Sequence, residues 1–129
     1  MSKPAVPVSS NGVGKRHGLD VRLDEKVVHR NGTGRDFGGD GIAYYQGTTK
    51  EFGTFTFHVN TQDRTAWEDI ATPEGTIHLK GTGGQAGQGA YIFQVDGRTS
   101  TGKYKGATGT AESRVSVSSR LMTVHLMLD

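Results

Sequence analysis

The side chains best suited to chemistry lie in the segment Ala66-Trp67-Glu68-Asp69-Ile70, where two carboxylates stand among apolar residues. If this segment is a β-strand, successive side chains point to opposite faces, so Glu68 lies on one face and Trp67 and Asp69 on the other. A carboxyl group that faces an apolar interior loses hydration, which raises its pKa and suits it to proton transfer or to hydrogen bonding with a substrate. The opposite orientation, with Trp67 in the core and Glu68 in solvent, fits the alternation equally well.

Other kinds of catalytic or metal site find little support. The chain has no cysteine, which excludes disulfides, zinc–thiolate sites, iron–sulfur clusters and cysteine nucleophiles. Its five histidines include no pair at i,i+2 or i,i+4, and no G-x-S-x-G nucleophile motif is present. His58 and His78 alternate with apolar neighbours, so we expect them on the surface. We therefore expect neither a metal site nor a bound cofactor.

Two glycine-rich segments imitate nucleotide-binding motifs. The segment Gly97–Lys103 has the spacing of a phosphate-binding P-loop, but it is followed by Tyr104 and then by Gly106-Ala107-Thr108-Gly109, which cannot begin a stable helix. The segment Gly81–Ala86 imitates a dinucleotide fingerprint and also precedes no helix. Both are predicted to be loops.

The charge balance argues against a nucleic-acid partner. The sequence has 129 residues with 15 basic and 13 acidic side chains, a net charge of +2. Lys3, Lys15 and Arg16 fall within residues 1–17, which contain no acidic residue, so the remaining residues carry a net charge of −1. A nucleic-acid-binding domain concentrates basic residues on its folded surface. The longest uninterrupted apolar run is Ala90–Phe93, far too short for a membrane helix, and no secretory signal is visible. We expect a cytoplasmic single-domain protein.

The elements that must position Glu68 are β-strands, because apolar residues recur with a period of two from residue 18 onward. Leu19, Val21 and Leu23 alternate with polar residues, as do Phe55, Phe57 and Val59, and no segment has the pattern of an amphipathic helix. Gly, Asp and Asn separate these segments as they do in turns. Eight strands are predicted, at residues 18–30, 36–47, 51–61, 65–72, 75–82, 88–96, 106–118 and 120–128.

Eight short strands at this spacing predict a β-sandwich or a closed antiparallel barrel. Glycines within or at the ends of strands, such as Gly41, Gly53 and Gly109, favour the barrel, because its strands bend sharply. The alternation also continues to the last residues, which leaves no evident edge strand. We therefore predict an all-β fold in which residues 1–17 form a flexible N-terminal leader and residues 18–129 form one eight-stranded antiparallel barrel. The interior of such a barrel holds packed side chains or one small ligand.

A resemblance to a known family rests on four segments between Trp67 and Arg114. They are Glu68-Asp69-Ile70, Gly75-Thr76-Ile77-His78-Leu79-Lys80-Gly81, Phe93-Gln94-Val95 and Gly102-Lys103-Tyr104-Lys105-Gly106-Ala107-Thr108-Gly109-Thr110. The last of them resembles the G-x-Y/F-x-G turn shared by plant allene oxide cyclases, dirigent proteins and bacterial spirotetronate cyclases. The chain thus resembles the allene oxide cyclase-like barrel family over about a third of its length.

The resemblance implies an eight-stranded barrel, usually oligomeric, with an apolar internal pocket, no cofactor and a cyclase activity. It places Trp67 and Asp69 outside the barrel, which favours an inward Glu68. The residues that it places inside are Glu68, Tyr91, Phe93, Ser113 and Val115. Two features depart from the family: Asp20–Asn31 lacks the site on the first strand of the plant enzymes, and Ser113 occupies a position that is a large aromatic residue in a spirotetronate cyclase.

Two functions of different classes follow. The first is a cofactor-free cyclase that folds a linear polyketide or polyene inside the barrel, by a Diels–Alder-type [4+2] reaction in natural-product biosynthesis. Glu68 is its candidate catalytic residue, and Glu68 and Ser113 would bind a substrate carbonyl or hydroxyl. The second is a non-catalytic carrier of hydrophobic ligands or a dirigent-type scaffold. In either case we expect a hydrophobic small-molecule ligand and a homodimer or homotrimer with Trp67 near its interface. The candidate residues of the binding pocket are Tyr44 (or Tyr45), Phe55, Phe57, Glu68, Tyr91, Phe93, Ser113 and Val115.

Overall fold

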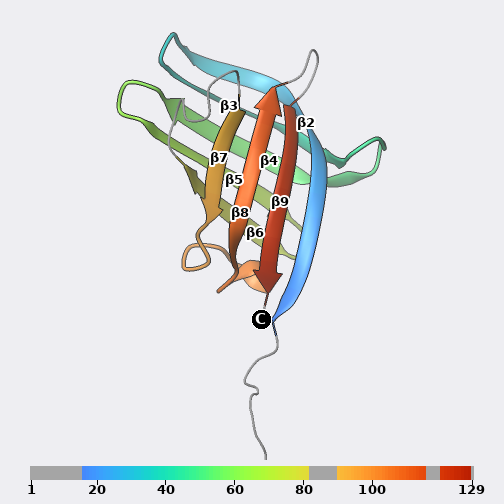
Figure 1. Ribbon diagram of the computed structural model, residues 1–129. Coiled ribbons are helices and arrows are strands. Elements are labelled where there is room, and N and C mark those ends of the chain that lie inside the picture. The colour runs from blue at the N-terminus through green and yellow to red at the C-terminus, as the bar shows by residue number, and fades with distance from the viewer. Residues whose placement is uncertain (1–15, 82–89, 116–119, 129) are drawn as a thin grey trace, which may run out of the picture.

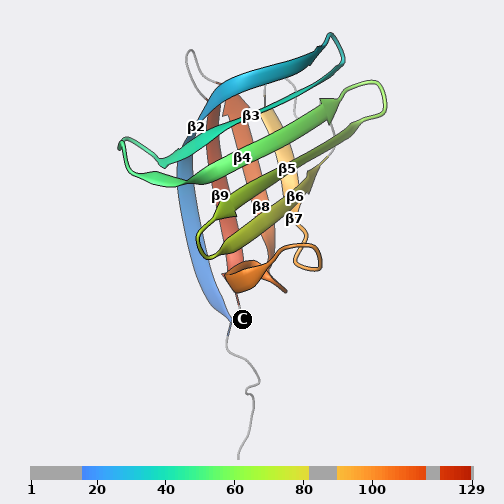
Figure 2. The same ribbon diagram turned by 180° about the vertical axis from the view of Figure 1, so that it is seen from behind.

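The computed structural model describes residues 16–81, 90–115 and 120–128, and these residues form one closed β-barrel. Eight antiparallel strands, β2 to β9, follow one another around the barrel in chain order, and β9 pairs with β2 to close it (Figures 1 and 2). The predicted all-β, eight-stranded barrel is confirmed. Residues 1–15 of the predicted leader lie outside the described residues. The strands are β2 (His17–Thr33), β3 (Asp36–Tyr45), β4 (Glu51–Asn60), β5 (Thr65–Thr72), β6 (Gly75–Gly81), β7 (Ala90–Val95), β8 (Thr108–Val115) and β9 (Arg120–Leu128).

The strand β2 closes the barrel because it is long enough to serve two neighbours. Its first part, His17–Glu25, pairs with β9, whereas Leu23–Thr33 pairs with β3. The register shifts between Val27 and His29, and Figure 1 shows the strand curving around the barrel. A bulge of this kind increases the local bend and twist of a strand. The bend therefore lets one strand pair with β9 along its first part and with β3 along its second.

The boundaries differ from the predicted strands by a few residues, mainly where a hairpin turn extends or shortens a strand. The β2 strand continues to Thr33, three residues beyond the prediction, because it pairs with β3 up to the turn at Gly34. Between β7 and β8 lies a loop with one short 3₁₀ helix, η1 (Gly102–Tyr104). No α-helix follows the segment Gly97–Lys103, so its predicted identity as a loop is confirmed. In the predicted loop Gly81–Ala86, residues 82–86 lie outside the described part of the chain.

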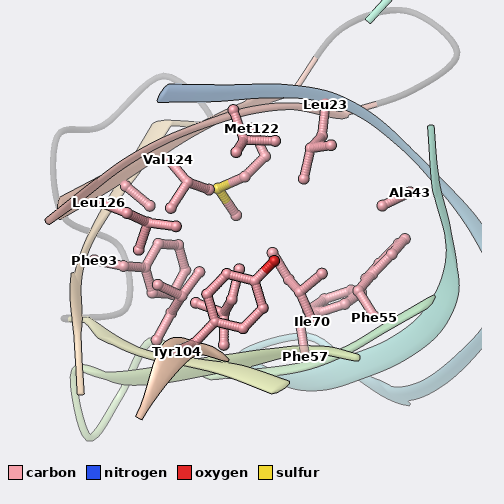
Figure 3. Packing of buried hydrophobic residues seen from close by; sticks show 14 of the residues in the cluster. Leu23, Ala43, Phe55, Phe57, Ile70, Phe93, Tyr104, Met122, Val124 and Leu126 are labelled. Carbon is pink, nitrogen blue, oxygen red and sulfur yellow. The ribbon is translucent and has the colours of Figure 1, made fainter. Parts of the chain in front are cut away.

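Alternate side chains of the strands point into the barrel and pack there as a core, as the period-two pattern predicts (Figure 3). Tyr104 of η1 contributes a buried ring, and its hydroxyl points toward the middle of the core in Figure 3. Figure 1 shows η1 at the end of the barrel where β9 finishes, so Tyr104 closes that end. The largest fully buried apolar side chains come from β2, β4, β5, β6, η1 and β9: Leu23, Phe55, Val59, Ile70, Ile77, Leu79, Tyr104, Met122, Val124 and Leu126.

Glycine permits two close backbone contacts in the wall. A Cβ atom at Gly41 on β3 would overlap the carbonyl oxygen of Lys26, and one at Gly109 on β8 would overlap the carbonyl oxygen of His125. Gly109 also has φ of +142°, a conformation that residues with a side chain rarely adopt. At these two positions the neighbouring backbone comes closer than a side chain would allow. Within the described residues, no helix is long and apolar enough to cross a membrane.

Candidate functional site

Glu68 faces the barrel interior, which settles the alternative that the sequence left open. It lies on β5 opposite Phe57 of β4 and Leu79 of β6, and its side chain is fully buried. Trp67 and Asp69, its neighbours in the chain, are on the outside, where the Asp69 carboxylate contacts His78. A polar side chain with no access to water therefore stands among apolar ones, and such a group needs hydrogen-bonding partners.

Two further charged residues supply those partners. Arg120, the first residue of β9, donates from Nη2 to Oε1 of Glu68 at 3.0 Å and from Nε to Oε1 of Glu25 at 3.3 Å. Glu25 and Arg120 lie directly opposite each other on β2 and β9, and Glu25 is fully buried. We refer to Glu25, Glu68 and Arg120 as the interior cluster.

Two aromatic rings on β4 support the guanidinium group of the cluster. The centre of that group lies 4.2 Å from the ring centroid of Phe57 and 5.8 Å from that of Phe55. The two rings are themselves stacked, with centroids 6.2 Å apart. Cation–π attraction of this kind strengthens when water is excluded. The rings and the two carboxyl groups together fix the position and the plane of Arg120.

The interior cluster contains two carboxyl groups and only one cation. Burial is the main reason why the pKa of Glu68 lies well above its usual value, and the charge of Glu25 and a hydrogen bond with Glu25 raise it further, while Arg120 acts in the opposite direction. When both carboxyl groups are ionised, the Oε2 atoms of Glu25 and Glu68 have no donor among the described residues. The raised pKa means that Glu68 holds a proton more readily than an exposed glutamate does, and a proton there would let one carboxyl group donate to the other.

A fourth polar side chain lies in the interior beside the cluster. Ser113 of β8 is fully buried, and its hydroxyl oxygen has no hydrogen-bond partner in the described part of the chain. It lies opposite Met122 of β9, two residues along that strand from Arg120, and opposite Tyr91 of β7. Leaving a buried hydroxyl unpaired costs about 1–3 kcal/mol. The hydroxyl is therefore available to a bound molecule.

The structure brings most of the predicted pocket residues together and moves one away. Phe55, Phe57, Phe93 and Ser113 are buried inside with Glu68, and Tyr91 is half-buried against the same core. Val115 is the last residue of β8 and pairs with Arg120, but its side chain lies outside what the structure describes.

Tyr44 does not line the interior, and its predicted place in the pocket is wrong. Ala43 belongs to the core, so the following residue on the strand points outward. The ring of Tyr44 lies 5.8 Å from Nζ of Lys26. Tyr45, the alternative, is 37 % exposed and packs edge-on against Phe52.

Glu25 and Arg120 are the site residues that the sequence analysis missed. A signal for both was present, because each occupies a position at which its strand's alternation calls for an apolar side chain. Val21 and Leu23 lead to Glu25 on β2, and Met122 and Val124 follow Arg120 on β9. A charged residue in the inward phase of a strand marks either a functional site or an internal ion pair.

The outer face of β4 to β6 carries a row of ring contacts. Trp67 stacks between His58 and His78, with centroids 6.3 and 6.5 Å away, and Nε2 of His58 lies 2.6 Å from a carboxylate oxygen of Asp36. The predicted surface position of both histidines is confirmed. A hollow of about 470 Å³ lies on this face beside Trp67, Asp69 and His78. No group of three or more potential metal ligands is present in residues 16–81, 90–115 and 120–128.

Comparison with known proteins identifies a similar fold. The chain is similar to the solved structure of pyocyanin demethylase with a TM-score of 0.63 and 15 % sequence identity, over 84 % of this chain and 99 % of that one. No family model and no curated protein matches the sequence. The likeness shows that this barrel has the fold of a named enzyme of similar extent.

Proposed function

We propose that this protein is a barrel enzyme that binds a small, largely apolar molecule in its interior and promotes its cyclisation. The observation that carries the proposal is the interior cluster, a buried Glu–Arg–Glu arrangement inside an apolar barrel. Buried ion pairs are seldom better for stability than well-packed apolar side chains of the same volume. A barrel with a purely structural interior has no need of them. The similarity to a barrel that is an enzyme by name supports the proposal.

The distribution of polarity along the interior indicates how a substrate would lie. Arg120 begins β9, and the inward side chains that follow it are Met122, Val124 and Leu126. One end of the ligand thus meets charged groups, and the remainder meets apolar ones. This arrangement suits a linear polyketide or polyene that carries a carbonyl group at one end.

The proposed reaction is a [4+2] cycloaddition between a diene and a carbonyl-activated alkene of the same substrate. Three carbon–carbon π bonds become one as two carbon–carbon σ bonds form, so the reaction balances without a proton, an oxidant or a reductant. Holding the diene and the alkene in contact accelerates the reaction, because the entropy loss then occurs on binding and not in the transition state. Effective molarities of about 10⁵–10⁸ M are the upper limit of this effect. Donors aimed at the carbonyl oxygen would further stabilise the negative charge that gathers there.

The test uses 1,7,9-decatrien-3-one, a linear trienone that closes slowly to a bicyclic ketone without a catalyst. We expect the protein to accelerate this closure with saturation kinetics. The control variant Glu112→Gln, which replaces a glutamate on the outer face of β8 instead of one in the interior cluster, should accelerate it equally well. Saturable binding of the trienone by calorimetry without acceleration would make the protein a carrier. If the trienone were neither bound nor closed faster, an interior site for this class of molecule would be refuted.

We further propose that the protein acts as a cytoplasmic homodimer or homotrimer. Support comes from large apolar side chains on its outer surface, of which Val28, Ile92 and Met127 are 58, 41 and 40 % exposed. Light scattering at micromolar concentration should give a mass of two or three times 13.8 kDa. A mass of 13.8 kDa would contradict the proposal.

A further inference from the structure

We infer that Arg120 and Ser113 together hold the substrate oxygen, and that the substrate class is therefore a neutral carbonyl compound. In this arrangement the carbonyl oxygen accepts hydrogen bonds from Nη1 of Arg120 and from Oγ of Ser113. The inference rests on the proposed function for the place where the ligand binds, and it adds the group that is recognised and the residues that recognise it.

Arg120 has a donor to spare, held in a fixed direction. Its Nε and Nη2 atoms donate to Glu25 and Glu68, whereas Nη1 donates to no group in the described part of the chain. The guanidinium group is planar and its donors form a rigid fork, so two bonds and the ring of Phe57 determine where the third nitrogen points. Arg120 is 9 % exposed and both carboxylic residues are 0 % exposed, so the arginine is the member of the cluster that a ligand can reach.

Ser113 provides the second donor from the neighbouring strand. Its hydroxyl is buried and unpartnered, and it lies on the same side of the wall as Arg120, across from Met122. A serine hydroxyl can rotate to donate to an acceptor placed between the two strands. The two donors thus come from neighbouring strands, β9 and β8, at positions two residues apart in their register.

The charges of the site select a neutral acceptor. A cationic ligand would be repelled by Arg120 at short range. An anionic ligand would bring a further negative charge to two carboxyl groups that share one guanidinium group, and burying such a charge costs several kcal/mol. A ketone or enone oxygen needs only donors, and Arg120 and Ser113 supply two.

Binding of (E)-3-decen-2-one, compared with 2-methyl-1,3-decadiene, tests this inference. The second molecule has a methylene group in place of the carbonyl oxygen and otherwise the same shape. We expect the wild-type protein to bind the ketone at least about tenfold more tightly, equivalent to about 1.4 kcal/mol. We expect this preference to fall below about threefold in Ser113→Ala, which removes an unpaired buried hydroxyl and so does not endanger the fold. Thr110→Ala, which removes an outward hydroxyl from the same strand, should keep the full preference.

The carbonyl stretching band of the ¹³C-labelled ketone gives a readout that packing alone would not change. Bound to the wild-type protein, the band should lie at lower wavenumber than in hexane, and it should return toward the hexane value in Ser113→Ala. The double variant Glu25→Gln/Arg120→Gln removes both members of one ion pair, so that no unpaired charge is left inside. It should abolish most of the shift while retaining the circular dichroism spectrum of the wild type.

Equal affinity for the ketone and the hydrocarbon in the wild-type protein would overturn the inference. So would a carbonyl band that is the same in the wild type, Ser113→Ala and the double variant. A shifted band together with no acceleration of trienone closure would uphold the inference and refute the cyclase, so the two failures are distinguishable.

Discussion

Glu68 and Arg120 join opposite walls of the barrel. Their strands, β5 and β9, are four positions apart in either direction around the ring of eight, yet Nη2 of Arg120 donates to Oε1 of Glu68 at 3.0 Å. Glu25 reaches the same guanidinium group from β2, the neighbour of β9. Three strands thus meet through one side chain.

Replacing Glu68 by glutamine should have a small effect on catalysis. The amide of Glu68→Gln keeps an oxygen that accepts from Arg120 and gains an N–H group that can donate to Glu25, as the protonated acid does. We expect the single-turnover rate of trienone closure to fall by no more than tenfold, which corresponds to about 1.4 kcal/mol. A loss of more than a hundredfold, with the circular dichroism spectrum unchanged, would instead assign a proton-transfer role to Glu68.

Glu25→Gln should be more damaging to stability than Glu68→Gln. Because the pKa of Glu68 is raised, its carboxyl group is the weaker balance for the charge of Arg120, and Glu25→Gln removes the other carboxyl group. Breaking one side of a buried ion pair costs about 3–5 kcal/mol. Urea unfolding at pH 7 should show a loss of this size for Glu25→Gln and a clearly smaller one for Glu68→Gln. Equal losses would contradict the distinct roles assigned to the two carboxyl groups.

The pKa of Glu68 also predicts how stability depends on pH. Because the folded protein raises this pKa above its value in the unfolded chain, the folded state holds the proton more tightly. The resulting stabilisation is fully present below pH 4.5, the ordinary value for glutamate, and is lost as the pH rises through the folded-state pKa. Measured between pH 4 and pH 9, the free energy of unfolding of the wild type should therefore fall relative to that of Glu68→Gln. A constant difference between the two proteins would show that Glu68 keeps its ordinary pKa.

Asp96 predicts the opposite dependence on pH, on the outside of the barrel. Lys80 lies 2.7 Å from the Asp96 carboxylate and, through its hydrogen bond, is the main cause that lowers the pKa of Asp96 to about 2. The stabilisation is present above pH 3.8, the ordinary value, and is lost as the pH falls through about 2. Asp96→Asn should thus have a lower melting temperature than the wild type at pH 7. The two should approach each other near pH 2, and parallel melting curves at both pH values would disagree with this account.

Gly109 and Gly34 form a matched pair of substitution sites that tests how tightly β8 packs against β9. Both have positive φ, but a Cβ atom at Gly109 would overlap the His125 carbonyl, whereas nothing lies within 4 Å of one at Gly34. Gly109→Ala should lower the free energy of unfolding by more than about 2 kcal/mol, since backbone strain adds to the overlap. Gly34→Ala should cost about 1 kcal/mol, from strain alone. Similar losses in the two variants would mean that the close approach of β8 to β9 is easily relieved.

The fold could be predicted from the sequence because it follows from local patterns. Alternation in segments such as Phe55-Thr56-Phe57 fixes which side chains face inward, and glycine and asparagine mark the turns. The end of β2 was missed because Asn31-Gly32-Thr33 has no apolar side chain and its Asn-Gly pair is typical of a turn, so only pairing with β3 identifies it as strand. Closure of the sheet between β2 and β9 joins residues 17 and 128, a contact that no local pattern contains.

The site could be predicted only in part, for a related reason. The alternation of side chains along β5 was equally compatible with an inward and an outward Glu68, and only the family resemblance favoured the interior. Glu25 and Arg120 are 95 residues apart, and each alone looks like an ordinary charged residue near the end of an alternating run. Their importance arises from pairing across β2 and β9. Tyr44 was assigned to the interior because it is aromatic, although Ala43 in the core turns it outward.

The position of the Tyr104 ring limits how a molecule could enter and leave the barrel. Backbone hydrogen bonds from Lys103 to Glu74 and from Thr101 to Thr76 hold η1, and with it Tyr104, across one end of the barrel. The strand β9, which begins at Arg120, starts at the opposite end (Figure 1). In the function proposed above, a molecule in the interior would have to enter and leave by the same end. Release of one product would then have to precede the binding of the next substrate.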